Sequence, residues 1–116
     1  LLEGAKQVGA VRVAAVKLED MGMDALRAMG DGVKDRAPDM VAVLASTAGE
    51  KVNILCVCGA DAVKAGAHAG KIVKEIAAMC GGGGGGRPDS ATAGGKDPSK
   101  LETALQAAAG VVEKLL

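Results

Sequence analysis

The sequence contains no phenylalanine, tyrosine or tryptophan. A hydrophobic core therefore has to be built from valine, leucine, isoleucine, alanine and methionine. No base can stack on an aromatic ring, which excludes the aromatic platforms that bind single strands and the aromatic sheet of RNA-recognition modules. Because hydrophobic residues still make up 49% of the chain, we expect an ordered domain with a core.

A net charge is also absent, because 14 basic and 14 acidic residues cancel. This excludes a generally basic nucleic-acid-binding protein. No apolar run approaches the ~18 residues of a membrane span, and no signal peptide is recognisable, so we predict a cytoplasmic protein without membrane contact. Since the chain starts at Leu1 without a methionine, we expect a piece of a longer protein, and a mitochondrial or plastid form with an upstream transit peptide stays open.

A catalytic set is missing too: there is one histidine, no placed serine nucleophile and no cluster of carboxylates. We therefore predict no catalytic residue. Cys56, Cys58, Cys80 and His68 are four potential metal ligands, but no CxxC pair is present and the spacing fits no standard zinc site. We therefore predict that the chain holds no metal and that its thiols are inert. Because Cys56 and Cys58 are two residues apart on a predicted strand, we expect their side chains to lie on the same face of it.

The apolar pattern predicts an α/β domain over residues 1–116, with a small mixed sheet flanked by about three helices. Strands are predicted at residues 10–16, 40–45, 52–57 and, as a short edge strand, 91–93. Helices are predicted at residues 24–36, 62–79 and from 98 onward, with Asp24, Asp61 and Asp97 as their N-caps.

The presence of six consecutive glycines, residues 81–86, is the feature to explain. Ordering them costs on the order of 3–6 kcal/mol more than ordering alanines. A slack linker is one interpretation. We favour a structured loop whose bare N–H groups face an anion, because Arg87-Pro88-Asp89 and a capped helix follow directly. The run is not a Walker A loop, since Arg87-Pro88 stands where Lys-Ser or Lys-Thr is needed.

The segment GGGGGGRPDSATAGGKDPSKL, residues 81–101, closely resembles a signature near the C-terminus of alanyl-tRNA synthetases, usually GGKGGGRPDxAQAGGxDPxKL. Two upstream segments, LASTAGEKVNIL (44–55) and AGAHAGKIVKEIA (65–77), resemble the same family in the same order. The resemblance identifies the globular part of that family's C-terminal domain, a DHH-associated type of domain.

The resemblance implies a non-catalytic module that binds the elbow of alanine-specific tRNA and helps aminoacylation and editing act on one tRNA. Its partners would be tRNA, other domains of the same synthetase and, as an open case, a second copy in a homodimer. It implies no cofactor here, because ATP and zinc would belong to upstream domains. Gly83 stands where the family usually has lysine, and the loss of that lysine removes one phosphate contact that the resemblance would imply. Thr92 stands where the family usually has glutamine.

Residues 61–100 carry six basic and four acidic side chains, against seven basic and eight acidic in residues 1–60. A mildly positive surface beside open N–H groups suits phosphate and ribose contacts. The predicted nucleic-acid-binding residues are Gly84, Gly85, Gly86, Arg87, Lys64, Lys71, Lys74 and Lys96.

Three alternatives stay open at this point. The first is the substrate-binding domain of a DHH-type phosphoesterase, although that family usually has histidine where Arg87 stands. The second is the C-terminal module of a free-standing alanyl-tRNA editing hydrolase. The third is a dimerisation domain.

Overall fold

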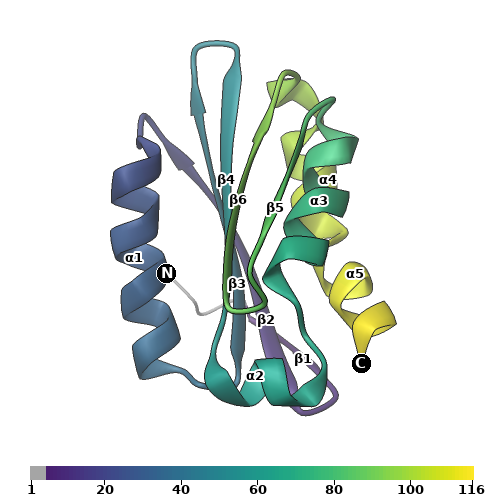
Figure 1. Ribbon diagram of the computed structural model, residues 1–116. Helices are drawn as coiled ribbons and strands as arrows, with labels where there is room; N and C mark the ends of the chain where they lie inside the picture. The colour runs from purple at the N-terminus through teal and green to yellow at the C-terminus, as the bar shows by residue number, and fades with distance from the viewer. Residues whose placement is uncertain (1–4) are drawn as a thin grey trace.

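A computed structural model describes residues 5–116, apart from the side chain of Ala48. Its strands form one six-stranded mixed sheet in the order β1-β2-β3-β4-β6-β5 (Figure 1). Strands β2 and β3 are parallel and all other neighbours are antiparallel. The strands are β1 (Lys6–Val8), β2 (Val11–Glu19), β3 (Met40–Ala48), β4 (Lys51–Cys58), β5 (Gly83–Gly86) and β6 (Ser90–Gly95). The predicted fold class is confirmed; residues 1–4 of the predicted domain lie outside the described residues.

Helices cover both faces of this sheet (Figure 1). One face packs on α1, and the other on α3, α4 and α5. The helices are α1 (Met23–Arg36), α2 (Ala60–Ala65), α3 (Ala69–Met79), a 3-10 turn (Pro98–Lys100), α4 (Leu101–Gln106) and α5 (Ala108–Leu115). None of the helices described within residues 5–116 has the length and apolar character needed to cross a bilayer.

The central strands are apolar over residues 40–45 of β3 and 54–58 of β4, where both of their faces are buried. Along β3, Val41 and Val43 point to the α3 side, whereas Ala42 and Leu44 point to the α1 side. Cys56 and Cys58 on β4 both face the α3 side and are fully buried, so their predicted common orientation is confirmed.

The prediction of one long helix over residues 62–79 is wrong, because the structure has two helices there, α2 and α3. Gly66 ends α2 in the left-handed region at φ +119°, which interrupts the helical path. His68 then starts α3, because its Nδ1 accepts a hydrogen bond from the Lys71 N–H at 3.2 Å. The sequence pattern missed this break because its apolar positions continue across it.

The predicted aspartate caps have mixed outcomes. Asp97 does cap the last helical segment, since its carboxylate accepts from the Ser99 N–H at 3.1 Å. Asp24 and Asp61 lie in first turns, and Gly22 and Gly59 hold the N-cap positions. The final helix is also divided, because α4 ends at Gln106 and α5 begins at Ala108.

The glycine run is not a loop over its last four residues. Gly83–Gly86 form β5, the outermost strand, which pairs antiparallel with β6. The short edge strand predicted at 91–93 lies inside β6, which is flanked on both sides by other strands, so its edge position is wrong. The sequence pattern missed β5 because glycines lack the β-branched side chains by which strands are recognised, and without β5 the strand at residues 91–93 would lie at the edge.

Two of these glycines are required by close approach. A methyl group at Gly84 would overlap the Cβ of Ala93 and lie 2.5 Å from the Thr92 carbonyl oxygen. A methyl group at Gly86 would lie 2.8 Å from the Cβ of Ala91. The alternate positions, Gly83 and Gly85, have nothing within 4 Å in the same direction. The run therefore has a period of two, with crowded positions at 84 and 86 and open ones at 83 and 85.

This alternation predicts opposite results for two neighbouring substitutions. We expect Gly84→Ala to lower the free energy of unfolding by about 1–3 kcal/mol, because the added methyl overpacks the contact with β6. We expect Gly85→Ala to be neutral or stabilising by about 0.4–1 kcal/mol, since it restricts only the unfolded chain. Urea unfolding of both variants measures the difference. Equal stability of the two would contradict the crowding of Gly84.

Candidate functional site

A groove of about 370 Å³ lies between α1 and the β5–β6 hairpin. Helix α1 packs on β3 and β4, so the same face of β5 and β6 is left without a helix above it (Figure 1). The groove is lined by Arg27 and Asp31 from α1 and by Gly85, Gly86, Arg87, Ser90, Ala91 and Thr92 from the hairpin. Two arginines thus border a floor that consists mostly of small residues.

The floor of the groove exposes backbone. Gly85 lies directly opposite Thr92 in the β5–β6 register, so both residues face the α1 side. Because no atom lies within 4 Å of the Cβ position at Gly85, a ligand can approach the main chain there. The hydroxyls of Ser90 and Thr92 add hydrogen-bonding groups that carry no charge.

The turn that carries Arg87 is held by α3. The N–H groups of Ala69 and Gly70 donate to the carbonyl oxygens of Pro88 at 2.9 Å and Arg87 at 3.2 Å. A Cβ at Gly70 would lie 2.5 Å from the Gly86 carbonyl oxygen, so only glycine allows α3 to approach the strand this closely. The first amides of α3 are therefore occupied by protein groups, and the backbone of Arg87 is fixed while its side chain is 77% exposed.

Asp89 lies between two cations. Its carboxylate oxygens are 3.3 Å from Lys34 Nζ and 3.6 Å from Arg87 Nε. Partial burial acts to raise the Asp89 pKa, but the hydrogen bond from Lys34 and the charges of Lys34 and Arg87 outweigh it, so that the pKa lies below its usual value. Asp89 is therefore ionised near neutral pH and connects α1 to the Arg87 turn.

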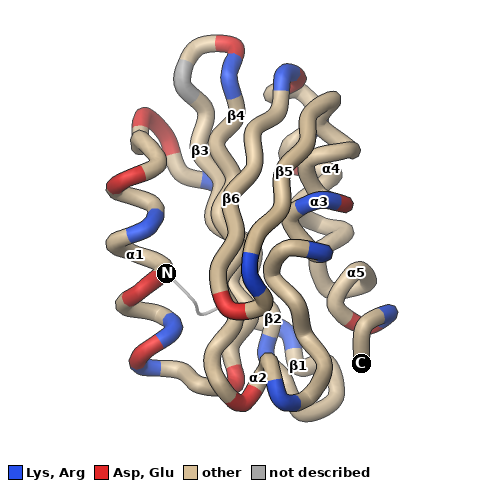
Figure 2. Tube along the Cα trace, in the orientation of Figure 1, with Lys and Arg blue, Asp and Glu red and all other residues tan. Residues whose placement is uncertain are grey.

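The structure brings only part of the predicted site together. Gly85, Gly86 and Arg87 line the groove, whereas Gly84 lies outside its lining and has its Cβ position blocked by Ala93 and Thr92 of β6. Basic residues on α3 lie beside β5, outside the groove, and others lie at the two ends of the hairpin region (Figure 2). The predicted residues outside the groove are Lys64 on α2, Lys71 and Lys74 on α3, and Lys96 after β6.

Sequence reasoning missed Arg27. It lies on the exposed side of α1, next to the fully buried Leu26, and no local pattern relates it to residues 60 positions further along the chain. Tertiary packing alone brings it to the groove. An available signal was its spacing of four residues from Asp31, which places both side chains on one helix face.

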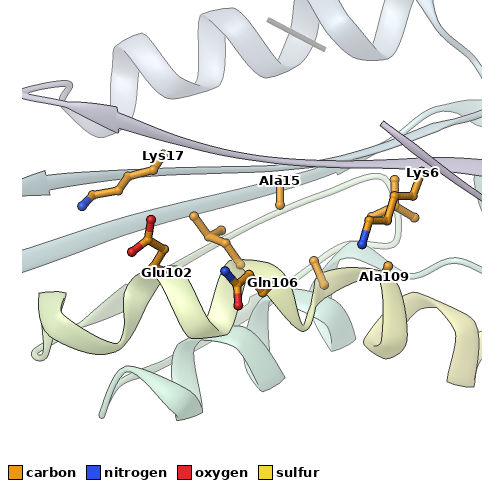
Figure 3. A pocket seen from close by; sticks show the side chains of 9 residues that line it. Lys6, Ala15, Lys17, Glu102, Gln106 and Ala109 are labelled. Atoms are coloured by element: carbon orange, nitrogen blue, oxygen red, sulfur yellow. The ribbon is translucent and has the colours of Figure 1, made fainter. Parts of the chain in front are cut away.

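A second hollow of about 380 Å³ lies on the other face of the sheet, between β2 and the α4–α5 pair (Figure 3). Its floor includes Ala15 and Ala109, and the charged side chains around it are Lys6, Lys17 and Glu102. These charges have both signs, and no glycine exposes backbone there. Nothing among its lining residues selects one class of ligand.

The three cysteines are buried in the structure, and the histidine caps a helix. The neighbouring Cys58 thiol and full burial raise the pKa of Cys56 well above its usual value. Cys80 is also buried, and His68 caps α3. Within residues 5–116, no group of three or more histidine, cysteine, aspartate or glutamate side chains is arranged to hold a metal ion.

Comparison with known proteins relates this chain to one group. It is 45% identical over 115 residues to an alanine–tRNA ligase of Exiguobacterium sibiricum, covering 99% of the chain and 13% of that protein. It is 54% identical over 100 residues to an alanine–tRNA ligase of Geobacillus kaustophilus, covering 86% of the chain and 11% of that protein. The chain thus spans about an eighth of the length of these curated relatives.

A solved structure has the same fold. The crystal structure of the C-Ala domain from Aquifex aeolicus alanyl-tRNA synthetase superposes with a TM-score of 0.86 at 27% identity, covering 94% of this chain and 97% of that one. Residues 10–114 match the sequence pattern of the DHHA1 domain. This matched range contains the groove, the glycine strand and every predicted site residue. The chain therefore belongs to the DHHA1 domain family.

Proposed function

We propose that this chain is a non-catalytic module that binds tRNA as part of an alanine–tRNA ligase. The observation that carries the proposal is the groove with a glycine floor between Arg27 and Arg87. It occurs in a chain whose curated relatives are alanine–tRNA ligases and whose structural neighbour is the C-Ala domain of such an enzyme.

The groove suits a sugar–phosphate backbone. Arg27 and Arg87 would contact phosphates, and the absence of a side chain at Gly85 would let the ribose approach the β5 main chain. Asp31 and Thr92 offer acceptors for a 2′-hydroxyl, the group that distinguishes RNA from DNA. Without aromatic side chains this surface would recognise the shape of folded RNA, in keeping with binding at the tRNA elbow.

A tRNA is larger than the groove, so contacts outside it are part of the proposal. Lys71 and Lys74 are exposed on α3, the helix that packs against β5. Together with Lys64 and Lys96 they are proposed as further phosphate contacts. Gly84 and Gly86 would serve the site indirectly, because they allow β5 to lie close to β6.

The rest of the activity would belong to other domains of the parent ligase. We propose that those domains bind ATP, alanine and zinc, and that this module holds the tRNA while aminoacylation and editing act on it. Tethering would raise the overall affinity by on the order of 10²–10⁴ through effective concentration. The parent would act in the cytoplasm, and a second copy of the chain is a proposed additional partner.

The first test is a gel-shift titration of the chain with an alanine tRNA transcript. With about three to four phosphates neutralised, we expect weak binding whose logarithm falls with the logarithm of salt concentration with a slope of about −2 to −4. A transcript with a disrupted elbow should bind less tightly. Dimerisation in gel filtration without tRNA binding would instead favour a dimerisation domain.

The second test concerns the two arginines of the groove. We expect Arg27→Ala and Arg87→Ala each to weaken tRNA binding and to reduce the salt slope by about one charge, because each removes one phosphate contact. Arg36→Ala is the matched control, since Arg36 is exposed on the same helix as Arg27 but does not line the groove. If all three variants lose the same affinity, only the overall charge matters and the groove is not the binding site.

A further inference from the structure

A series of three charged side chains joins α1 to the groove. Lys34 on α1 contacts one carboxylate oxygen of Asp89, Oδ2, at 3.3 Å, and Arg87 contacts the other, Oδ1, at 3.6 Å. The Asp89 main chain is also fixed, because its carbonyl oxygen accepts from the Cys58 N–H at 2.9 Å. The carboxylate thus has a defined place between one cation that lines the groove and one that does not.

The two cations differ in their availability to a ligand. The side chain of Lys34 is 24% exposed and makes a hydrogen bond to Asp89. The side chain of Arg87 is 77% exposed, and its Nε lies 3.6 Å from Asp89 Oδ1, a distance too long for a hydrogen bond. The two terminal nitrogens of Arg87, which form the fork that binds phosphate in a bidentate manner, make no hydrogen bond to Asp89, whose side-chain hydrogen bond comes from Lys34.

We infer that Lys34 and Asp89 are positioning residues that orient Arg87 toward an RNA phosphate, with Lys34 acting through Asp89 and not on the RNA. This inference rests on the proposed function. Lys34 neutralises Asp89, so the carboxylate directs the Nε side of Arg87 without competing for its fork. When Lys34 is removed, Asp89 has Arg87 as its remaining close cation and draws the guanidinium away from the phosphate.

A double-mutant cycle measured by tRNA affinity tests this directly. We expect Lys34→Met to lower the affinity about three- to tenfold in the otherwise unchanged chain. In an Asp89→Asn background the same substitution should change the affinity less than about twofold, because the carboxylate through which Lys34 acts is gone. It should have as little effect in an Arg87→Ala background. Lys34→Arg, which keeps the charge, should restore binding to within about twofold.

The Arg87→Ala background separates positioning from direct contact. If Lys34 touched a phosphate, Lys34→Met would lower affinity equally in all three backgrounds and would reduce the salt slope by about one charge even where Arg87 is absent; that result would overturn the inference. Arg36→Met controls for the loss of one charge at the same end of α1, and the thermal midpoint of each variant controls for folding. Full binding by Arg87→Ala would remove Arg87 from the site and overturn the inference, whereas failure of the unchanged chain to bind tRNA would overturn the proposed function.

Discussion

The close approach of β5 to both β6 and α3 is the constraint on which the groove depends. Gly84 and Gly86 bring the strand against Ala93 and Ala91, and Gly70 brings α3 against the Gly86 carbonyl. A side chain at any of these three glycines would push the hairpin outward. The carbonyls of Arg87 and Pro88 would then leave the first amides of α3, which are partially positive through the helix dipole. The position of Arg87 therefore follows from glycines of β5 and α3, whose lack of side chains allows this close approach.

The parts of the fold that follow from sequence are those in which local pattern and tertiary burial agree. The apolar runs of β3 and β4 predict strands buried on both faces, and Asp97-Pro98 predicts a capped helix start that the structure contains. The glycine strand could not be predicted, because its residues are identical in sequence. The alternation of two appears only in the structure, where neighbouring atoms leave no room for a Cβ at Gly84 and Gly86 but leave room at Gly83 and Gly85. The break at Gly66 is hidden in the same way, since it depends on a left-handed conformation that glycine permits but does not require.

The candidate site shows the same division. Gly85, Gly86 and Arg87 are adjacent in sequence and could be grouped from it, whereas Arg27 and Lys34 reach the hairpin only because α1 packs across β3 and β4. Lysines that share a helix face, such as Lys71 and Lys74, can be grouped from the sequence because they are only three residues apart. The structure places them beside the glycine strand and outside the groove. Long-range packing is therefore what separates the lining cations from the others.

A chain without net charge can still border a groove with more basic than acidic side chains, here Arg27 and Arg87 against Asp31. Asp39 is paired with Arg12 and Glu75 with Lys114, and neither acid lines the groove. Asp89 is the acid closest to Arg87 among these ion pairs, and the Lys34 contact offsets its charge. Since Gly85 contributes no side chain, the attraction for an anion has to come from the few cations at the border of the floor. Such a surface would favour weak, salt-sensitive binding, which suits the proposed role as one of several contacts to tRNA.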